Sequence, residues 1–153
     1  MVKKDWVMDI IEKVLMDNGV QKYFWGGSRR FGWNHSPNPD YDIFVLIGPK
    51  TDLKEISMLL KLKSVPVYTA YATSGIHLET SIFGNDIDII VFQQEELFSM
   101  LQAEHRILEN FLLEHQEIKT IFSNLPISGV LKYRAVLESL SMIGDVWTAP
   151  IQI

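Results

Sequence analysis

The chain has 153 residues and a net charge of −5, and it contains no cysteine. This length suffices for one domain with a core of its own. The missing cysteines exclude a disulfide framework and a thiolate metal site, and they agree with the reducing cytoplasm in which we expect the protein. No apolar run is long enough to span a membrane, so no membrane association is expected. The acidic charge argues against binding of long duplex nucleic acid, which needs clustered Lys and Arg.

The first third of the chain predicts a helix followed by two strands. Asp5 can cap a helix whose apolar residues recur at helical spacing until Gly19. Because charges interrupt the apolar pattern, we expect an amphipathic helix rather than a signal peptide. Residues 20–25 predict a strand and residues 29–39 a polar, aromatic loop. Residues 42–47 predict a central strand that is covered on both faces.

The middle of the chain predicts another helix, a strand and a β-hairpin. Asp52 and Glu55 resemble a capping box for the helix, and residues 65–71 predict the strand. Gly84-Asn85 lies between two apolar runs and predicts a two-residue turn.

In the expected register Phe83 pairs with Asp86, Ser81 with Asp88, and Glu79 with Ile90. Cross-strand partners share a face, so the hairpin is expected to have an acid-rich face and an apolar core face. The acid-rich face carries Glu79, Ser81, Asp86 and Asp88, and the core face carries Leu78, Thr80, Ile82, Ile87, Ile89 and Val91.

The last third of the chain predicts helices. Residues 94–123 fit one long or two shorter helices, and a last helix is expected over residues 129–143. We expect an α/β (α+β) fold with a mixed, largely antiparallel sheet of about five strands, helices packed on one face, and C-terminal helices. Residues 1–93 would form the core, and residues 94–153 a helical extension that packs on the same domain and offers a surface for oligomer formation.

A glycine turn and two carboxylates form the most informative motif. Gly26-Gly27-Ser28 ends the first strand, and Asp40-Tyr41-Asp42 opens the central strand. Carboxylates at positions i and i+2 of a strand point to the same face and repel each other, so a cation is expected between them. Mg²⁺ prefers oxygen ligands and often has a phosphate group of the substrate as one of them. A glycine turn with free backbone N–H groups can bind the phosphates of a triphosphate.

These segments, followed by Ile87-Asp88-Ile89, resemble the nucleotidyltransferases of the DNA polymerase beta superfamily, in particular their minimal branch. The resemblance covers about the first two thirds of the chain. It implies transfer of a nucleoside monophosphate from an NTP, by default ATP, to a hydroxyl of a protein, an RNA or a small molecule. Two Mg²⁺ ions are the implied cofactors.

The resemblance also implies roles for individual residues. Asp40, Asp42 and Asp88 would hold the metal ions as the catalytic acids. The phosphates of the nucleotide would be bound by Gly26, Gly27, Ser28 and Arg29.

Several alternatives remain open from the residues alone. Asp40 and Asp42 also fit ordinary turn and capping chemistry, and Asp86 competes with Asp88 as the third acid. Arg30 competes with Arg29 for the triphosphate, and both fit solvated side chains equally well. Glu79 and Ser81 are weaker site candidates, because they depend on the hairpin register.

The basic pair Lys61 and Lys63 could hold a triphosphate or a short stretch of RNA. His77, His105 and His115 show no metal-ligand spacing. The main alternative function is a catalytically silent, antitoxin-like binding or regulatory module with the same fold. A metal-dependent glycosyltransferase also uses Asp-x-Asp, but this chain is short for one.

Overall fold

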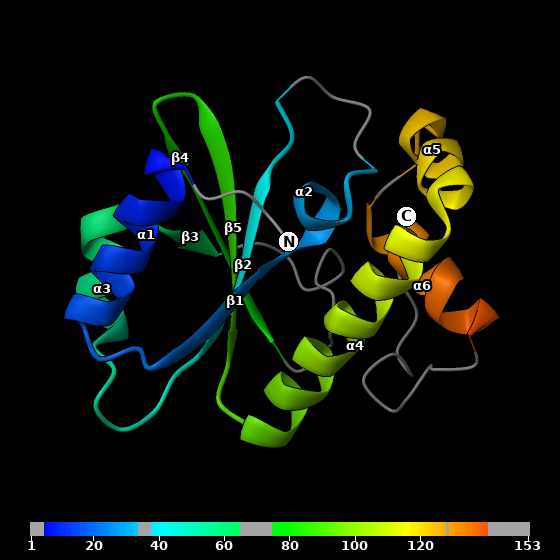
Figure 1. Cartoon of the computed structure of the whole chain (residues 1–153). Coiled ribbons are helices and arrows are strands. Elements are labelled where there is room, and N and C mark those ends of the chain that lie inside the picture. Colours follow the sequence, from blue (N-terminus) through cyan, green and yellow to red (C-terminus); the bar gives the residue numbers. More distant parts are fainter. Residues whose placement is uncertain (1–4, 34–37, 65–74, 128, 141–153) are drawn as a thin grey trace.

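The computed structural model describes residues 5–33, 38–64, 75–127 and 129–140, which form six helices and a five-stranded sheet (Figure 1). In chain order the elements are α1 (Trp6–Asp17), β1 (Lys22–Gly26), α2 (Gly27–Phe31), β2 (Tyr41–Leu46), α3 (Leu53–Leu60), β3 (Lys63–Ser64), β4 (Ile76–Ile82), β5 (Asn85–Phe92), α4 (Glu95–Glu114), α5 (Gln116–Asn124) and α6 (Gly129–Ser139). None of the described helices combines the length and the apolar character needed to cross a membrane.

The strands lie in the order β1-β2-β5-β4-β3. Strands β2 and β5 run parallel, and the other three pairs are antiparallel. This confirms the predicted mixed, largely antiparallel sheet. The strand expected over residues 65–71 and the helix end expected near residue 143 lie outside the described residues.

Local capping sets the start of the two helices that cover one face of the sheet. The Asp5 carboxylate accepts a hydrogen bond from the backbone N–H of Met8 at 3.1 Å, and Asp52 accepts one from Glu55 at 3.0 Å. Each bond satisfies a backbone donor that the first helical turn leaves without a partner. Both predicted N-caps are confirmed, but the capping box is only half formed, because the backbone N–H of Asp52 donates to the carbonyl of Asn18 at 2.9 Å.

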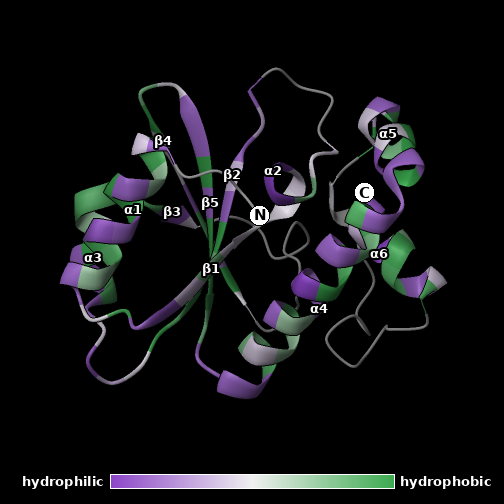
Figure 2. Cartoon of the chain, viewed as in Figure 1, coloured by the Kyte–Doolittle hydropathy of each residue, from purple (hydrophilic) through white to green (hydrophobic). Residues whose placement is uncertain are grey.

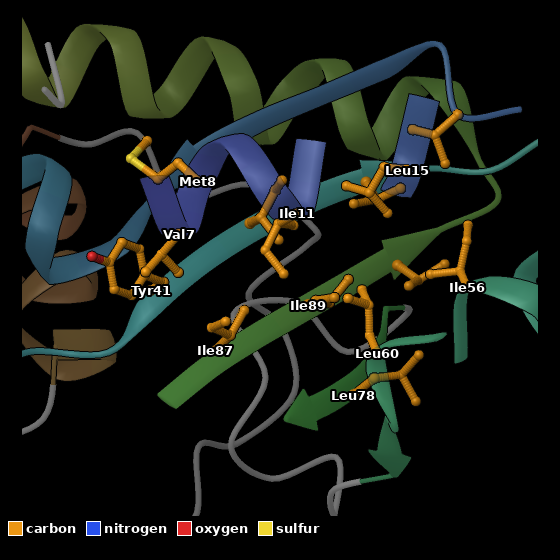
Figure 3. Close-up of a cluster of buried hydrophobic side chains, with 14 residues drawn as sticks. Val7, Met8, Ile11, Leu15, Tyr41, Ile56, Leu60, Leu78, Ile87 and Ile89 are labelled. Carbon is orange, nitrogen blue, oxygen red and sulfur yellow. The ribbon is translucent and has the colours of Figure 1, made fainter. Parts of the chain in front are cut away.

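Helices α1 and α3 pack on one face of the sheet through a buried cluster, which Figure 3 shows in close-up. The cluster includes Ile11 and Leu15 of α1, Ile56 of α3, and Ile87 and Ile89 of β5. The C-terminal helices α4 and α6 pack against the other face, where a second buried cluster joins them to β1, β2 and β5. Figure 2 shows hydrophilic residues toward the upper end of the sheet, where β2 and β5 begin.

The hairpin register differs from the expected one. Ile82 pairs with Asn85, so Phe83 and Gly84 form the turn instead of Gly84-Asn85. Both turn residues have positive φ, as a tight hairpin turn that matches the strand twist requires. Phe83 is 86% exposed at this position, and its ring meets the Trp6 ring edge-on at 5.7 Å. Each cross-strand partner shifts by two residues, so the predicted acid-rich and apolar faces are preserved.

The expected loop over residues 29–39 begins as a helix. Gly27 has a φ of +72° and turns the chain from β1 into α2, which ends at Gly32 in the left-handed conformation. The predicted helical region over residues 94–123 forms two helices, α4 and α5, which meet at His115.

Candidate active site

Five residues, one from each strand, form a row across one face of the sheet. In order across the sheet they are Gly26, Asp42, Asp88, Glu79 and Lys63. Directly paired residues on neighbouring strands point to the same face. The parallel pairing of β2 with β5 therefore brings the carboxylates of Asp42 and Asp88, which are 46 positions apart in the sequence, next to each other.

The Gly26-Gly27 turn lies directly against this row. A Cβ atom built on Gly27 would lie only 2.0 Å from Oδ2 of Asp42, and one built on Gly26 would lie 2.6 Å from Nε2 of His105. These two positions therefore have no room for a side chain. The polypeptide backbone at Gly27 therefore approaches the Asp42 carboxylate more closely than a residue with a side chain could.

Like charges and burial perturb the acids of this site. Burial is the main cause that raises the pKa of the Asp42 carboxyl well above its usual value, and the charges of Asp88 and Asp40 and a hydrogen bond with Asp88 raise it further. Asp40, which lies just before β2, also has a raised pKa, first through burial and then through Asp88 and Asp86. The predicted acids Asp40, Asp42 and Asp88 thus lie close enough to affect one another.

His77 is a partner of Asp88 that the sequence reasoning missed. Its Nε2 lies 2.9 Å from Oδ1 of Asp88, and the two side chains are 8% and 19% exposed. The signal was present in the strand alternation, because His77 lies two residues before Glu79 and so shares its face. Metal-ligand spacing does not reveal this role, since His77 contacts the carboxylate of another residue.

A groove of about 450 Å³ opens beside the row. The end of α3, the segment before β2, and strands β3, β4 and β5 contribute to its walls. Its charged lining residues are Asp40, Lys61, Lys63, Glu79, Asp86 and Asp88. Both rival third acids, Asp86 and Asp88, face this groove, but it is Asp88 that pairs with Asp42.

The arginines after the glycine turn make contacts within the protein. The Arg29 guanidinium donates to the carbonyl of Pro39 at 3.1 Å and lies over the ring of Tyr41, 3.8 Å from the ring centroid. Arg30 donates to the carbonyl of Trp25 at 3.0 Å and to Glu109 at 3.3 Å. These contacts fix the chain on both sides of the turn.

The acids supply only oxygen donors, which suit Mg²⁺. Even so, no group of three or more His, Asp or Glu side chains is arranged to hold a metal ion within the part of the chain that the structure describes. Asp42 and Asp88 are paired neighbours on parallel strands, and the charge of Asp88 raises the pKa of Asp42 in the absence of a cation. The donor chemistry and the shared face fit the cation, and the carboxylates would have to separate around it.

Comparison of the chain with models of known protein families and with curated proteins gives no match. The functional interpretation therefore depends on the geometry and the chemistry of this site.

Proposed function

We propose that this protein is a metal-dependent nucleotidyltransferase that moves a nucleoside monophosphate from an NTP, by default ATP, to an acceptor hydroxyl. One observation carries the proposal. Asp42 and Asp88 lie side by side on parallel strands, and the backbone of Gly27 lies against Asp42 with no room for a side chain. This arrangement agrees with the resemblance to the polymerase beta superfamily, in which a glycine turn lies beside the metal-binding acids.

Asp40, Asp42 and Asp88 would hold Mg²⁺, with two ions expected from the resemblance. When bound, the ions would supply charge neutralisation for the reacting phosphate. The backbone N–H groups around Gly26 and Gly27 and the hydroxyl of Ser28, the second residue of α2, bind the β- and γ-phosphates.

In the proposed reaction the acceptor hydroxyl oxygen forms a bond to the α-phosphorus of ATP. The bond between the α-phosphorus and the oxygen bridging to the β-phosphate breaks, and pyrophosphate leaves. The Asp88 carboxylate accepts the hydroxyl proton, while its contact with His77 keeps it oriented. Most of the catalysis is positioning and charge stabilisation, as in other phosphoryl transfers.

Ligand binding provides the test. We expect Mg²⁺ with ATP to stabilise the folded protein, by about 2.7 kcal/mol at a hundredfold excess over the dissociation constant. Asp42→Asn should reduce this stabilisation. The stabilisation is measured for each variant as the difference between its free energies of unfolding with and without Mg²⁺ and ATP. Asp52→Asn is the matched control, because Asn also caps helices and Asp52 lies at the start of α3, outside the groove. An equal ligand increment in Asp42→Asn and Asp52→Asn would contradict the proposal.

A catalytically silent binding module is the second candidate. The observation that favours it is the lack of a ready metal-holding group of three side chains among the described residues. Incubation with labelled ATP, Mg²⁺ and host lysate separates the two functions. A labelled macromolecule that disappears with Asp42→Ala supports the enzyme, whereas partner binding without any labelling supports the module.

A further inference from the structure

Two lysines line the groove at its far end from the glycine turn. Lys63 is the fifth member of the row, and its backbone is opposite Glu79 on the neighbouring strand β4. Lys61 lies two residues before Lys63 in the chain and also lines the groove. Both side chains are exposed, and within residues 5–33, 38–64, 75–127 and 129–140 neither ammonium group forms an ion pair. The groove therefore has acids toward the centre of the sheet and two cations at its edge.

The position of these lysines separates them from the nucleotide phosphates. Strands are about 4.8 Å apart, so Lys63 lies roughly 19 Å along the row from Gly26, but only about 10 Å from Asp88. A phosphate bound at the Gly26-Gly27-Ser28 turn is therefore beyond the reach of Lys63. Lys63 is therefore available to a second anionic group on the other side of the acids.

The backbone at Lys61 provides an independent argument. Lys61 follows α3 in the left-handed conformation, with a φ of 54°, at the position where helices normally place glycine. The Thr80 hydroxyl donates to the carbonyl of Leu60 at 2.6 Å and ties this helix end to β4. The left-handed conformation and the Thr80 contact together fix the backbone at Lys61 beside the groove.

Building on the proposed function, we propose that Lys61 and Lys63 form an anion site that binds a phosphate ester of the acceptor. The site would place the acceptor so that its hydroxyl reaches Asp88 while its phosphate contacts the lysines. The acceptor class is then a hydroxyl compound that carries a phosphate, either the end of a single-stranded RNA or a small phosphorylated molecule. A cationic small molecule and an unmodified protein hydroxyl lack the group that these lysines recognise.

Direct binding tests the site without requiring turnover. A fluorescent single-stranded RNA hexamer is titrated with the full chain in Mg²⁺ buffer at several salt concentrations, and ribose 5-phosphate serves as the small ester in parallel calorimetric titrations. The variants are Lys61→Gly, which suits the left-handed backbone, and Lys63→Ala. Lys54→Ala is the matched control, because Lys54 is exposed on α3 and lies outside the groove.

We expect each groove variant to weaken binding about tenfold, the usual scale for losing a hydrogen bond to a charged group. For RNA each should also lower the salt slope by about one. Lysine-dependent binding of RNA supports a polymer acceptor, and lysine-dependent binding of ribose 5-phosphate alone supports a small one. Unchanged binding in the groove variants, an equal loss in Lys54→Ala, or no binding of either probe would overturn the inference.

The ATP measurement separates this inference from the proposed function. Lys61→Gly and Lys63→Ala should retain the full stabilisation by Mg²⁺ and ATP, because the lysines contact the acceptor. If both variants lose this stabilisation, the lysines bind the donor and the inference is wrong. If the unmodified protein shows no stabilisation by ATP but binds a phosphate ester through the lysines, the proposed function fails and the anion site remains.

Discussion

Gly27 and Asp42 are in such close contact that a methyl group at position 27 would overlap the carboxylate. The built Cβ atom lies 2.0 Å from Oδ2 and 2.7 Å from Cγ of Asp42. Gly27 also has a positive φ of 72°, which L side chains rarely adopt. The start of α2 and the acid on β2 therefore form one rigid unit, and both steric fit and backbone conformation require glycine.

Gly27→Ala should accordingly destabilise the fold and abolish the proposed nucleotide transfer. The left-handed backbone alone costs about 1–2 kcal/mol, and the displacement of Asp42 adds to it. Urea unfolding measures the stability, and labelled-ATP transfer measures the activity. Gly84→Ala is the control, since Gly84 has a φ of +79° but no atom within 4 Å of its built Cβ. Equal stability losses in the two variants would show that contact with Asp42 has no energetic effect.

Asp42 should make stability fall with rising pH when EDTA removes divalent cations. Its pKa is raised on folding, so above the usual value of 3.8 the unfolded chain loses this proton first, and stability decreases until the folded pKa is passed. Asp42→Asn should remove this part of the pH dependence and raise the free energy of unfolding at neutral pH, because it removes a buried charge. Thermal melts from pH 4 to pH 8 check this, and parallel curves for the two proteins would contradict it.

His105 should have the opposite effect at low pH. Its ring is fully buried among Phe24, Phe31, Phe44 and Tyr133, and burial lowers its pKa to about 3. The unfolded chain gains a proton below the usual pKa of 6.5, so stability is lost as the pH falls from 6.5 toward 3.

The loss attributable to His105 could reach about 5 kcal/mol, because one pKa unit corresponds to about 1.4 kcal/mol. His105→Gln keeps a hydrogen-bonding side chain and removes the titration. Urea unfolding between pH 4 and pH 7 should therefore show a weaker decline for the variant than for the unmodified protein. An identical decline would exclude His105 as the source.

His77 should position Asp88 during the proposed reaction. His77→Leu removes the contact at 2.9 Å, and loss of such a supporting hydrogen bond typically costs about 10–100-fold in metal affinity or activity. The Mg²⁺ dependence of transfer should shift more than the KM for ATP. His77→Gln should restore part of the loss, and His115→Gln, on an exposed side chain, should have no effect. A loss in His77→Leu that appears only as reduced stability would indicate a structural role.

Lys61→Gly should stabilise the fold. Glycine relieves the left-handed conformation after α3, with a gain of about 1 kcal/mol in the free energy of unfolding. Lys54 lies inside α3, so Lys54→Gly should instead lower the free energy of unfolding, by about 0.5–1 kcal/mol. Urea unfolding of both variants provides the measurement, and a destabilised Lys61→Gly would show that the lysine side chain contributes packing at this position.

Local physical chemistry explains which features could be read from the sequence. Asp5 and Asp52 cap helices through atoms three residues away, and apolar spacing identifies the faces of α1, α3 and the hairpin. The glycine turn and the acids Asp40 and Asp42 are likewise near one another in the chain. The sequence alone was therefore enough to predict a cation between the acids and a phosphate at the turn.

The tertiary structure decided which of these groups meet. Only the parallel pairing of β2 with β5 places Asp88 beside Asp42, and only the turn at Phe83-Gly84 sets Glu79 opposite Asp88. The contact of His77 with Asp88 and the position of Lys63 at the end of the row follow from the same strand order. Strand order and register depend on the burial of distant side chains against one another, and a pattern of neighbouring residues does not contain that information.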